Sequence, residues 1–487
     1  MHRAVYMLYL SHYINGQLVV PASGAFLDNI EPATGKVYSQ VPDGDARDVD
    51  LAVAAAETAF AEWSKMPAAA RSGILMKIAD LIDARADELA RAESIDNGKP
   101  ISLAQTLDIP RAAKNLRHFA TAILHTHTET HVMDGVALNY TLRQPRGVCG
   151  LISPWNLPLY LLTWKVAPAL AFGNTAVAKP SEITPMTAFL FSQLCIEAGL
   201  PPGVLNIVHG LGAKVGSAIT AHPKITTISF TGGTVTGREV AKTCAPLFKK
   251  VSLEMGGKNP TIVFADADME KVVAGSVQAA FANSGQVCLC GSRVFVERSI
   301  YNEFVRRFAD AASRLRVGDP LEPETQQGAM VSQAQLEKTM YYVDLAKQEG
   351  GRILCGGERP KSVNERCRDG YFYLPTVITD LGVSCRVNRE EIFGPVATVI
   401  PFDDEAQVAE YANATDYGLA ASVWTQNLPR AHRLAEQIQS GTVWINCWLV
   451  RDLRVPFGGM KQSGLGREGG EEAMRFFTEP KNVCVAG

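Results

Sequence analysis

Residues 147–199 read "GVCGLISPWNLPLYLLTWKVAPALAFGNTAVAKPSEITPMTAFLFSQLCIEAG", and this stretch decides the fold class. Two short apolar runs, 147–154 and 175–181, have the length and composition of buried strands. Each run is followed by a longer segment, 162–173 and 184–199, that is typical of a helix. Because strands that alternate with helices form parallel sheets with right-handed crossovers, we expect an α/β fold with a doubly wound parallel sheet.

The same alternation continues on the carboxyl side. Strands are predicted at "VLNIVHG" (204–210) and "TTISFTGG" (226–233), each followed by a predicted helix, 213–222 and 234–245. A second series of the same kind begins after "VSLEMGGKNPTIVF" (251–264) and runs to about residue 446. Two doubly wound domains are therefore expected.

Helical patterns dominate the region before this alternation. Residues 49–66 and 70–98 read as two amphipathic helices, the second of which ends at Gly98 before Pro100. A third helix is predicted over 107–124, with Asp108 as its N-cap.

Composition limits the classes of function. The chain has 487 residues, which suggests two or three domains, and its net charge of −3 gives no basic footprint for nucleic acid or an anionic membrane. It has no apolar run of the roughly 18 residues that a membrane span needs, and "MHRAVYMLYLSHYING" (1–16) lacks a signal-peptide cleavage site. Ten scattered cysteines do not form a disulfide framework, so we expect a reduced, cytoplasmic chain.

Two cysteines stand one residue apart in "NSGQVCLCGSR" (283–293). A structural zinc site needs about four ligands, and neither a second cysteine pair nor a paired-histidine motif is present, so no metal is expected. A disulfide between residues two apart is badly strained. Buried packing is the expectation for Cys290, whereas from the residues alone Cys288 is either a packed thiol or a nucleophile.

Two glycine-rich turns between a predicted strand and a predicted helix are candidates for phosphate binding. "GLGAKVG" (210–216) is one residue too long for the dinucleotide fingerprint and lacks its acidic partner, and "FTGGTVTG" (230–237) is a second such turn. Both turns present backbone N–H groups, but a tight turn alone also requires glycine.

Five motifs stand in one order along the chain, with "GQVCLC" (285–290) between the third and the fourth: "PWNLP" (154–158), "AKPSE" (178–182), "LEMGGKNP" (253–260), "EEIFGPV" (390–396) and "PFGGMKQSGLGREGG" (456–470). Together they resemble the signatures of the aldehyde dehydrogenase superfamily, from about residue 12 to 483. The resemblance implies an NAD-binding domain (1–122 and 147–255), a catalytic domain (256–455) and a small β oligomerisation segment (123–146 and 471–487). It also implies a homodimer or homotetramer, and "ALNYTLRQPRG" (137–147) and the tail are candidate strands for pairing with a neighbouring subunit.

The resemblance assigns three catalytic residues. Hydride transfer from an aldehyde needs a tetrahedral adduct, and a thiolate makes that adduct and leaves a thioester. By resemblance Cys288 is the nucleophile and Glu254 the general base, although a lone glutamate in a loop is otherwise a solvated residue. Asn156 is expected to donate its amide to the oxyanion, together with the backbone N–H of Cys288.

The cofactor implied by the resemblance is NAD. Lys179 and Glu182 match the pair that holds the adenosine ribose, and the Glu182 carboxylate disfavours the extra phosphate of NADP. Glu391 and Phe393 match the residues that position the nicotinamide ribose, whereas Gly233 stands where the family often has serine. The other residues expected at the cofactor are Ile152, Ser153, Pro154, Trp155, Ser181, Gly212, Gly216, Phe230, Gly232 and Met255.

Two arginines carry the substrate prediction. Arg451 lies in "NCWLVRDLRVPFGG" (446–459), where many relatives place an aromatic residue, and Arg111 opens the third predicted helix. By the resemblance, both positions face the family's substrate tunnel. A single arginine is usually solvated, but two in one tunnel favour a carboxylate, which matches the guanidinium fork. Arg454 lies nearer the exit of the loop.

The residues around both arginines resemble the aminomuconic and hydroxymuconic semialdehyde dehydrogenases. This implies oxidation of a semialdehyde with a distal carboxylate, with 2-aminomuconate 6-semialdehyde, from tryptophan (kynurenine) or aromatic ring-cleavage catabolism, preferred over 2-hydroxymuconic or another semialdehyde. A CoA-acylating relative typically lacks the base that Glu254 supplies, and a non-catalytic relative would lose Cys288, Glu254 or Asn156.

Overall fold

The computed structural model describes residues 7–487, so residues 1–6 of the expected NAD-binding domain and of the 1–16 stretch lie outside the described residues. The first of its two large sheets has the strand order β22-β12-β11-β8-β9-β10-β2-β3, and the five strands from β12 to β10 are parallel. In chain order these strands are β2 (His12–Ile14), β3 (Gln17–Val19), β8 (Val148–Ile152), β9 (Thr175–Lys179), β10 (Leu205–Ile207), β11 (Ile225–Thr231), β12 (Lys250–Glu254) and β22 (Gly464–Leu465).

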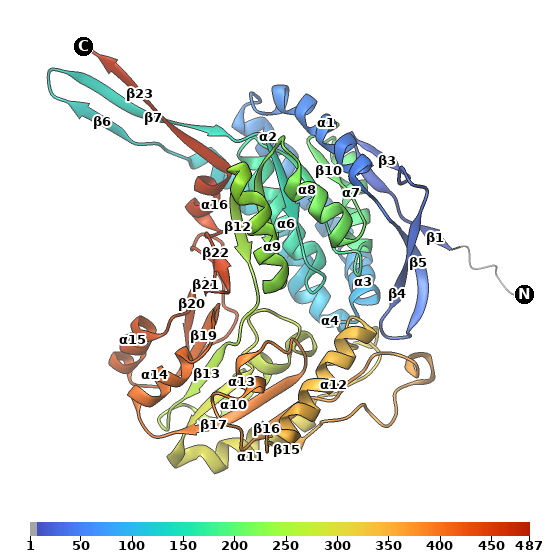
Figure 1. The fold of residues 1–487 in the computed structure, drawn as a ribbon, viewed down its shortest axis with the longest axis vertical. Helices are drawn as coiled ribbons and strands as arrows, with labels where there is room; N and C mark the ends of the chain where they lie inside the picture. Colours follow the sequence, from blue (N-terminus) through green and yellow to red (C-terminus); the bar gives the residue numbers. More distant parts are fainter. Residues whose placement is uncertain (1–6) are drawn as a thin grey trace, which may run out of the picture.

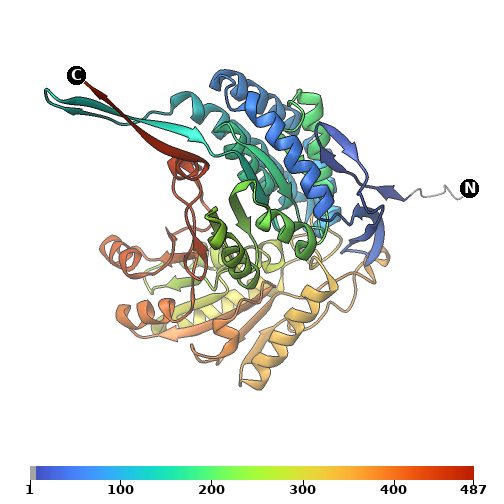
Figure 2. The ribbon, with the colours of Figure 1, turned by 45° about the horizontal axis from the view of Figure 1, so that its top comes forward.

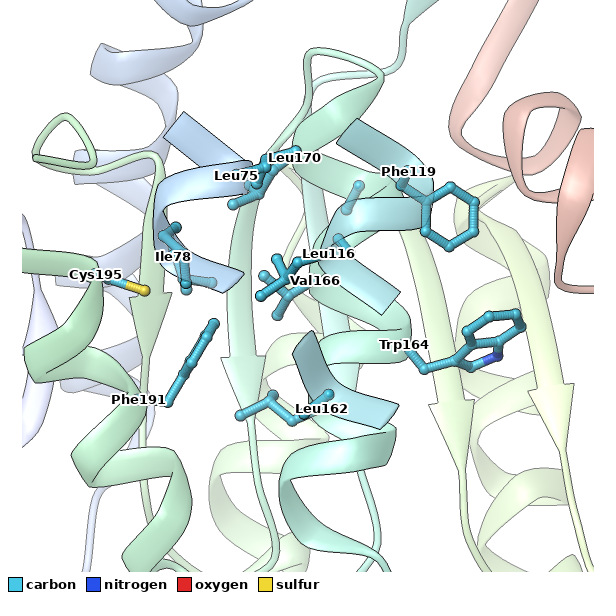
Figure 3. Close-up of a cluster of buried hydrophobic side chains, with 14 of the residues drawn as sticks. Leu75, Ile78, Leu116, Phe119, Leu162, Trp164, Val166, Leu170, Phe191 and Cys195 are labelled. Carbon is cyan, nitrogen blue, oxygen red and sulfur yellow. The ribbon is translucent and has the colours of Figure 1, made fainter. Parts of the chain in front are cut away.

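Helices cover both faces of this sheet (Figure 1). They are α1 (Ala46–Trp63), α2 (Ala68–Ala84), α3 (Ala86–Asn97), α4 (Ile101–Leu103), η1 (Ala104–Asp108), α5 (Ile109–Ala122), η2 (Ile123–His125), α6 (Pro158–Ala171), α7 (Met186–Ala198), η3 (Gly212–Gly216), α8 (Ser217–Ala221), α9 (Thr234–Cys244), η4 (Ala245–Leu247) and α16 (Gly470–Phe477). Alternate residues of β8 divide between two cores: Cys149 and Leu151 face α5 and α6, whereas Val148 and Ile152 face α1 and α9. Figure 3 shows the first core, in which side chains from α2, α5, α6 and α7 meet, with Trp164 at its edge.

The second large sheet has the order β15-β16-β17-β14-β13-β19-β20, in which only β15 is antiparallel to its neighbour. Its strands are β13 (Pro260–Val263), β14 (Arg293–Glu297), β15 (Arg352–Cys355), β16 (Thr376–Thr379), β17 (Val396–Phe402), β19 (Ala420–Trp424) and β20 (Thr442–Ile445). Its helices are α10 (Met269–Phe281), η5 (Ala282–Gly285), η6 (Arg298–Ile300), α11 (Tyr301–Ser313), α12 (Gln333–Gln348), η7 (Glu365–Cys367), α13 (Arg386–Arg389), α14 (Glu405–Asn413) and α15 (Leu428–Gln437). The prediction of two doubly wound parallel sheets is confirmed.

Three small sheets complete the fold. β1 (Leu8–Tyr9), β5 (Lys36–Pro42) and β4 (Phe26–Glu31) form one, and β18 (Tyr417–Gly418) pairs with β21 (Met460–Lys461). The third is an arm of β23 (Thr478–Ala486), β7 (Ala137–Pro145) and β6 (Thr130–Met133) that projects away from both large sheets in Figures 1 and 2. The sequence predicted strands in both segments, and here they pair with each other from Thr478↔Pro145 to Ala486↔Ala137. Over residues 7–487, no helix has the length and apolar character that a membrane crossing requires.

The second sheet is inserted between two adjacent strands of the first. The chain leaves the first sheet at the end of β12 and returns as β22, which pairs antiparallel with β12. At the crossing the backbone N–H of Met255 donates to the carbonyl of Ser463 at 2.9 Å. Glu254 therefore lies at the boundary between the two units.

Two local predictions were wrong. The single helix expected over 70–98 is two helices, because Arg85 has non-helical backbone angles (φ −114°, ψ 26°) and separates the end of α2 at Ala84 from the start of α3 at Ala86. Asp108 does not cap α5: it has helical backbone angles and closes the π-helical turn η1, and its carboxylate pairs with the fully buried Lys99. A buried ammonium needs a buried acid, and this requirement outweighs the cap.

Candidate active site

A strained turn places the predicted nucleophile. Asn283 and Ser284 both have left-handed backbone angles (φ 51° and 55°), and Gly285 follows at φ 70°. A Cβ on Gly285 would lie 2.0 Å from the carbonyl oxygen of Gly394, so only glycine fits there. Such strain persists only where the surroundings impose it. Here Asn259 helps to hold the loop, because its amide donates to the carbonyls of Cys288 (2.8 Å) and Cys290 (2.9 Å).

Cys288 lies where two cavities meet. The central cavity, about 170 Å³, is lined by Asn156, Gly232, Glu391 and Phe393 as well as by Cys288. The arginine cavity, about 40 Å³, is lined by Cys288 together with Glu254, Arg111 and Arg451. A third, outer cavity of about 230 Å³ shares residues 154–155 and 231–233 with the central one. Cys288 thus borders two cavities, and each of these cavities shares lining residues with its neighbour.

The two cysteines differ in access. Cys288 is partly exposed, whereas Cys290 is buried in an apolar cluster, its thiol 3.9 Å from the Ala282 carbonyl, which fits the packing predicted for it. Burial raises the pKa of the Cys288 thiol to about 12, and the carboxyl groups of Glu391 and Glu254 raise it further, while the positive charge of Arg451 lowers it. The resting group is therefore a thiol, and its reaction requires a base.

Glu254 is the candidate for that base, since it lines the same cavity as Cys288. Both of its carboxyl oxygens are buried and make no hydrogen bond within residues 7–487. Burial and then repulsion from Glu468 raise the pKa of this carboxyl well above its usual value. A base whose pKa is raised toward neutrality is better matched to proton transfer at physiological pH. Glu468 is engaged otherwise, because it accepts from Ser229 (2.8 Å) and pairs with the buried Lys165 (3.1 Å).

Asn156 is buried in the wall of the central cavity, in the loop between β8 and α6. Its amide nitrogen donates to the carbonyl of Gln286 at 2.9 Å, which orients the group toward the cysteine loop. An amide nitrogen carries two N–H donors, so one remains for an oxyanion.

The residues predicted to bind the cofactor all line these cavities. The outer cavity includes Ile152, Ser153, Pro154, Trp155, Lys179, Ser181, Glu182, Gly212, Gly216, Phe230, Gly232 and Gly233. The central cavity holds Glu391 and Phe393, and Met255 lines both it and the arginine cavity. The structure brings together every predicted position.

The outer cavity fits a dinucleotide. A Cβ on Gly212 or Gly233 would have no atom within 4 Å, so these glycines leave room in the cavity wall. Gly233 is the N-cap of α9 and offers no side-chain cap, so the N–H groups of the first turn are free for an anion. Lys179 and Glu182 also line this cavity, and the ammonium of Lys179 lies 2.9 Å from the carboxylate of Glu182.

Close backbone contacts fix Glu391 and Phe393 in the wall of the central cavity. Glu391 accepts from the backbone N–H of Gly257 at 3.0 Å, and a Cβ on Gly256 would lie 2.1 Å from the same carboxylate. Phe393 has a left-handed backbone (φ 61°), and its ring meets Trp155 edge to face at 5.2 Å. Burial raises the pKa of Glu391.

The sequence interpretation missed several residues of these cavities. Gln335 and Lys338 of α12 line the central cavity, and Gln335 donates to the carbonyl of Phe393 at 2.8 Å. They belong to no motif, and only the packing of α12 against the 390–394 loop brings them there. Tyr160, Trp164 and Phe457 line the arginine cavity, although all three lie in or beside motifs that were recognised.

Both predicted arginines reach the arginine cavity from different elements, Arg111 from α5 and Arg451 from the loop after β20. Within residues 7–487 neither makes a salt bridge, although Arg454, on the same loop, pairs with Asp452 and is exposed. The guanidinium of Arg451 lies over the rings of Phe457 (3.7 Å) and Trp164 (5.3 Å). Two arginines that make no salt bridge within the described residues therefore line the same cavity as Cys288.

Comparison with known proteins agrees with this geometry. Residues 19–483 match the Aldehyde dehydrogenase family. The chain is 52% identical over 480 residues to 2-aminomuconic semialdehyde dehydrogenase of Danio rerio, which covers 98% of each chain. It is 47% identical over 482 residues to 2-hydroxymuconic semialdehyde dehydrogenase of Pseudomonas sp. (strain CF600), which covers 98% of this chain and 99% of that one.

Among solved structures, the NAD+ complex of an aldehyde dehydrogenase from Bacillus cereus superposes with a TM-score of 0.95 at 41% identity, over 98% of this chain and 96% of that one. The fold predicted from the sequence and the resemblance stated there are both confirmed. The chain belongs to the aldehyde dehydrogenase family.

Proposed function

We propose that this enzyme oxidises a semialdehyde that carries a distal carboxylate to the dicarboxylic acid, with NAD as the oxidant. The preferred substrate is 2-aminomuconate 6-semialdehyde, and 2-hydroxymuconate 6-semialdehyde is the second candidate, because relatives named for each are about half identical to this chain. The observation that carries the proposal is the position of Cys288 between two cavities. The central cavity shares its wall with the outer, dinucleotide-binding cavity, and the arginine cavity holds two arginines that make no salt bridge within residues 7–487.

The residues around Cys288 perform the chemistry in two halves. Glu254 takes the proton of the Cys288 thiol and passes it to solvent. The thiolate then attacks the aldehyde carbon, and the amide of Asn156 and the backbone N–H of Cys288 stabilise the oxyanion that forms. Bound NAD supplies the hydride acceptor. Loss of hydride from the adduct leaves a thioester, and Glu254 then takes a proton from water, which attacks the thioester carbon. The carbon–sulfur bond breaks, and Cys288 is released with the carboxylic acid.

The outer cavity favours NAD over NADP. Lys179 and Glu182 are paired at its adenosine end, so a phosphate on the ribose would meet the Glu182 carboxylate. Glycine at position 233 leaves the pyrophosphate to the backbone N–H groups at the start of α9 rather than to a side chain.

Arg111 and Arg451 are proposed to bind the distal carboxylate. Loss of one charged partner from a desolvated site costs about 2–5 kcal/mol, or about ten-fold in specificity per 1.4 kcal/mol. Arg111→Ala and Arg451→Ala should each lower kcat/KM for 2-hydroxymuconate semialdehyde by tens-fold or more and leave hexanal nearly unchanged.

Arg454→Ala is the matched control, since this exposed arginine lies on the same loop and is neutralised by Asp452. Equal losses for the charged and the neutral aldehyde would refute the carboxylate proposal. Comparison of kcat/KM for the amino and hydroxy substrates then decides between the two candidates.

The arm of β6, β7 and β23 is proposed to contact another subunit in a homodimer or homotetramer. Val132, Met133, Val136 and Val485 expose half or more of their surface there, and such apolar side chains favour contact with another subunit. All ten cysteines are free thiols, which supports a reducing, cytoplasmic location.

A further inference from the structure

Tyr160 connects the two arginines. Its hydroxyl oxygen accepts from Nη1 of Arg451 at 3.2 Å, and its ring lies under the guanidinium of Arg111, 5.4 Å from the ring centroid. The residue is 4% exposed and lies in α6, two residues after its first residue, Pro158. One side chain thus contacts both cations that face the arginine cavity.

The backbone of Tyr160 is itself fixed. Its carbonyl accepts from the amide of the buried Asn115 on α5 at 3.0 Å and from the hydroxyl of Thr163 at 3.0 Å. Because Asn115 follows Arg111 by one helical turn on α5, this bond ties the backbone of Tyr160 to the helix that carries Arg111. Tyr160 therefore has a fixed position between α5, which carries Arg111, and the loop after β20, which carries Arg451.

The two guanidinium groups need such a support. Nη1 of Arg111 is buried without a hydrogen-bond partner within residues 7–487, and no salt bridge there holds either arginine. A carboxylate partner would hold the arginines but would also neutralise them. An aromatic face and a phenol oxygen orient a guanidinium and leave its charge available to a ligand.

We propose that Tyr160 is a positioning residue that determines specificity: it orients Arg111 through its ring and Arg451 through its hydroxyl, so that both face the distal carboxylate of the substrate. The inference rests on the proposed function, because it assumes that the arginines bind that carboxylate. Because the hydroxyl can be removed without the ring, variants of Tyr160 can separate its effect on Arg451 from its effect on Arg111.

The test compares Tyr160→Phe with Tyr160→Leu. Removal of the hydroxyl should raise KM for 2-hydroxymuconate semialdehyde and the Kd of adipate, a six-carbon dicarboxylate measured by calorimetry, by about ten-fold. Loss of the ring as well should raise both values further. In either variant kcat/KM should fall more for the charged substrate than for hexanal, because hexanal has no carboxylate for the arginines to bind.

Tyr13→Phe is the control for the loss of a buried phenol, since its hydroxyl has no hydrogen-bond partner within residues 7–487 and it lies on β2. In the double variant Tyr160→Phe with Arg451→Ala, the hydroxyl should matter no longer, because it acts through Arg451. Additive losses, equal losses for hexanal, or an unchanged KM and Kd would each overturn the inference.

The arginine variants, measured in the same assay, distinguish failure of the proposed function from failure of the role proposed for Tyr160. If Arg111→Ala and Arg451→Ala do not discriminate between charged and neutral aldehydes, the proposed function fails. If they do and Tyr160→Phe behaves as the wild type, only the role of Tyr160 is wrong.

Discussion

Glu254→Gln should make the protein both less active and more stable. The carboxyl is buried beside Glu468 and has no hydrogen-bond partner within the described chain, so its charged form is unfavourable in the fold. An unsatisfied buried acceptor costs about 1–3 kcal/mol, and more when it is charged. A neutral amide of the same shape removes the charge, so we expect a gain of this order in the free energy of unfolding.

The gain should depend on pH with a defined sign. The folded pKa of Glu254 is raised, so the native state holds the proton longer than the unfolded chain does. The wild type therefore loses stability as pH rises from the ordinary glutamate pKa, about 4.3, through the raised folded value. The advantage of Glu254→Gln should be absent near pH 4 and full in alkaline buffer.

Thermal unfolding at two pH values measures this difference. An unfolding entropy of about 2.1 cal/mol/K per residue makes 1 kcal/mol equivalent to about 1 °C in Tm for a chain of 487 residues. The variant should melt about 1–3 °C higher than the wild type in alkaline buffer. Glu254→Asp, which keeps the acid, is the control and should retain the pH dependence.

Rapid mixing measures the other half of the prediction. Loss of the general base should slow thioester hydrolysis by about 10²–10⁴-fold and leave hydride transfer faster than turnover. NADH should then appear as a burst of one equivalent per active site, followed by slow turnover that is limited by hydrolysis of the thioester. Turnover at the wild-type rate without a burst, or an equal Tm difference at both pH values, would refute the reasoning.

Two further predictions concern the thiol and the arm. Cys288→Ala should abolish oxidation and Cys290→Ala should leave most of it, since of these two cysteines only Cys288 borders the central and arginine cavities. Rapid quench and mass spectrometry should find the thioester on Cys288, and an adduct on Cys290 would contradict the assignment. Val132→Glu on β6, which is 70% exposed, should reduce the molar mass by light scattering, whereas Leu51→Glu on α1, also exposed, should not; an unchanged assembly would remove the arm from the interface.

Much of the fold could be predicted because it depends on local patterns. The strand at 147–154 and the helix after it follow from apolar runs and their lengths, and the structure has β8 and α6 there. The predicted site residues line common cavities because parallel strands bring their carboxyl ends to one edge of the sheet.

These failures share a physical cause, which is a side-chain contact made on folding that no local sequence pattern encodes. Asp108 had the composition of an N-cap, but Lys99 is buried next to it and takes its carboxylate. Gln335 and Lys338 lie on an ordinary amphipathic helix, and Tyr160 belongs to an apolar segment that predicts only burial. None of these contacts has a local signal.

The paired strands β12 and β22 bring residues 255 and 463 within hydrogen-bond distance of each other, so everything between them forms a closed excursion of the chain. A unit with adjacent ends can be gained, lost or exchanged in one genetic event without cutting the sheet that receives it. Glu254 stays with the host sheet and Cys288 travels with the excursion. The residues proposed for acid–base and for thiol chemistry therefore lie on two different units of the fold. A chimaera of the two units is expected to be active only if Glu254 and Cys288 still border the same cavity.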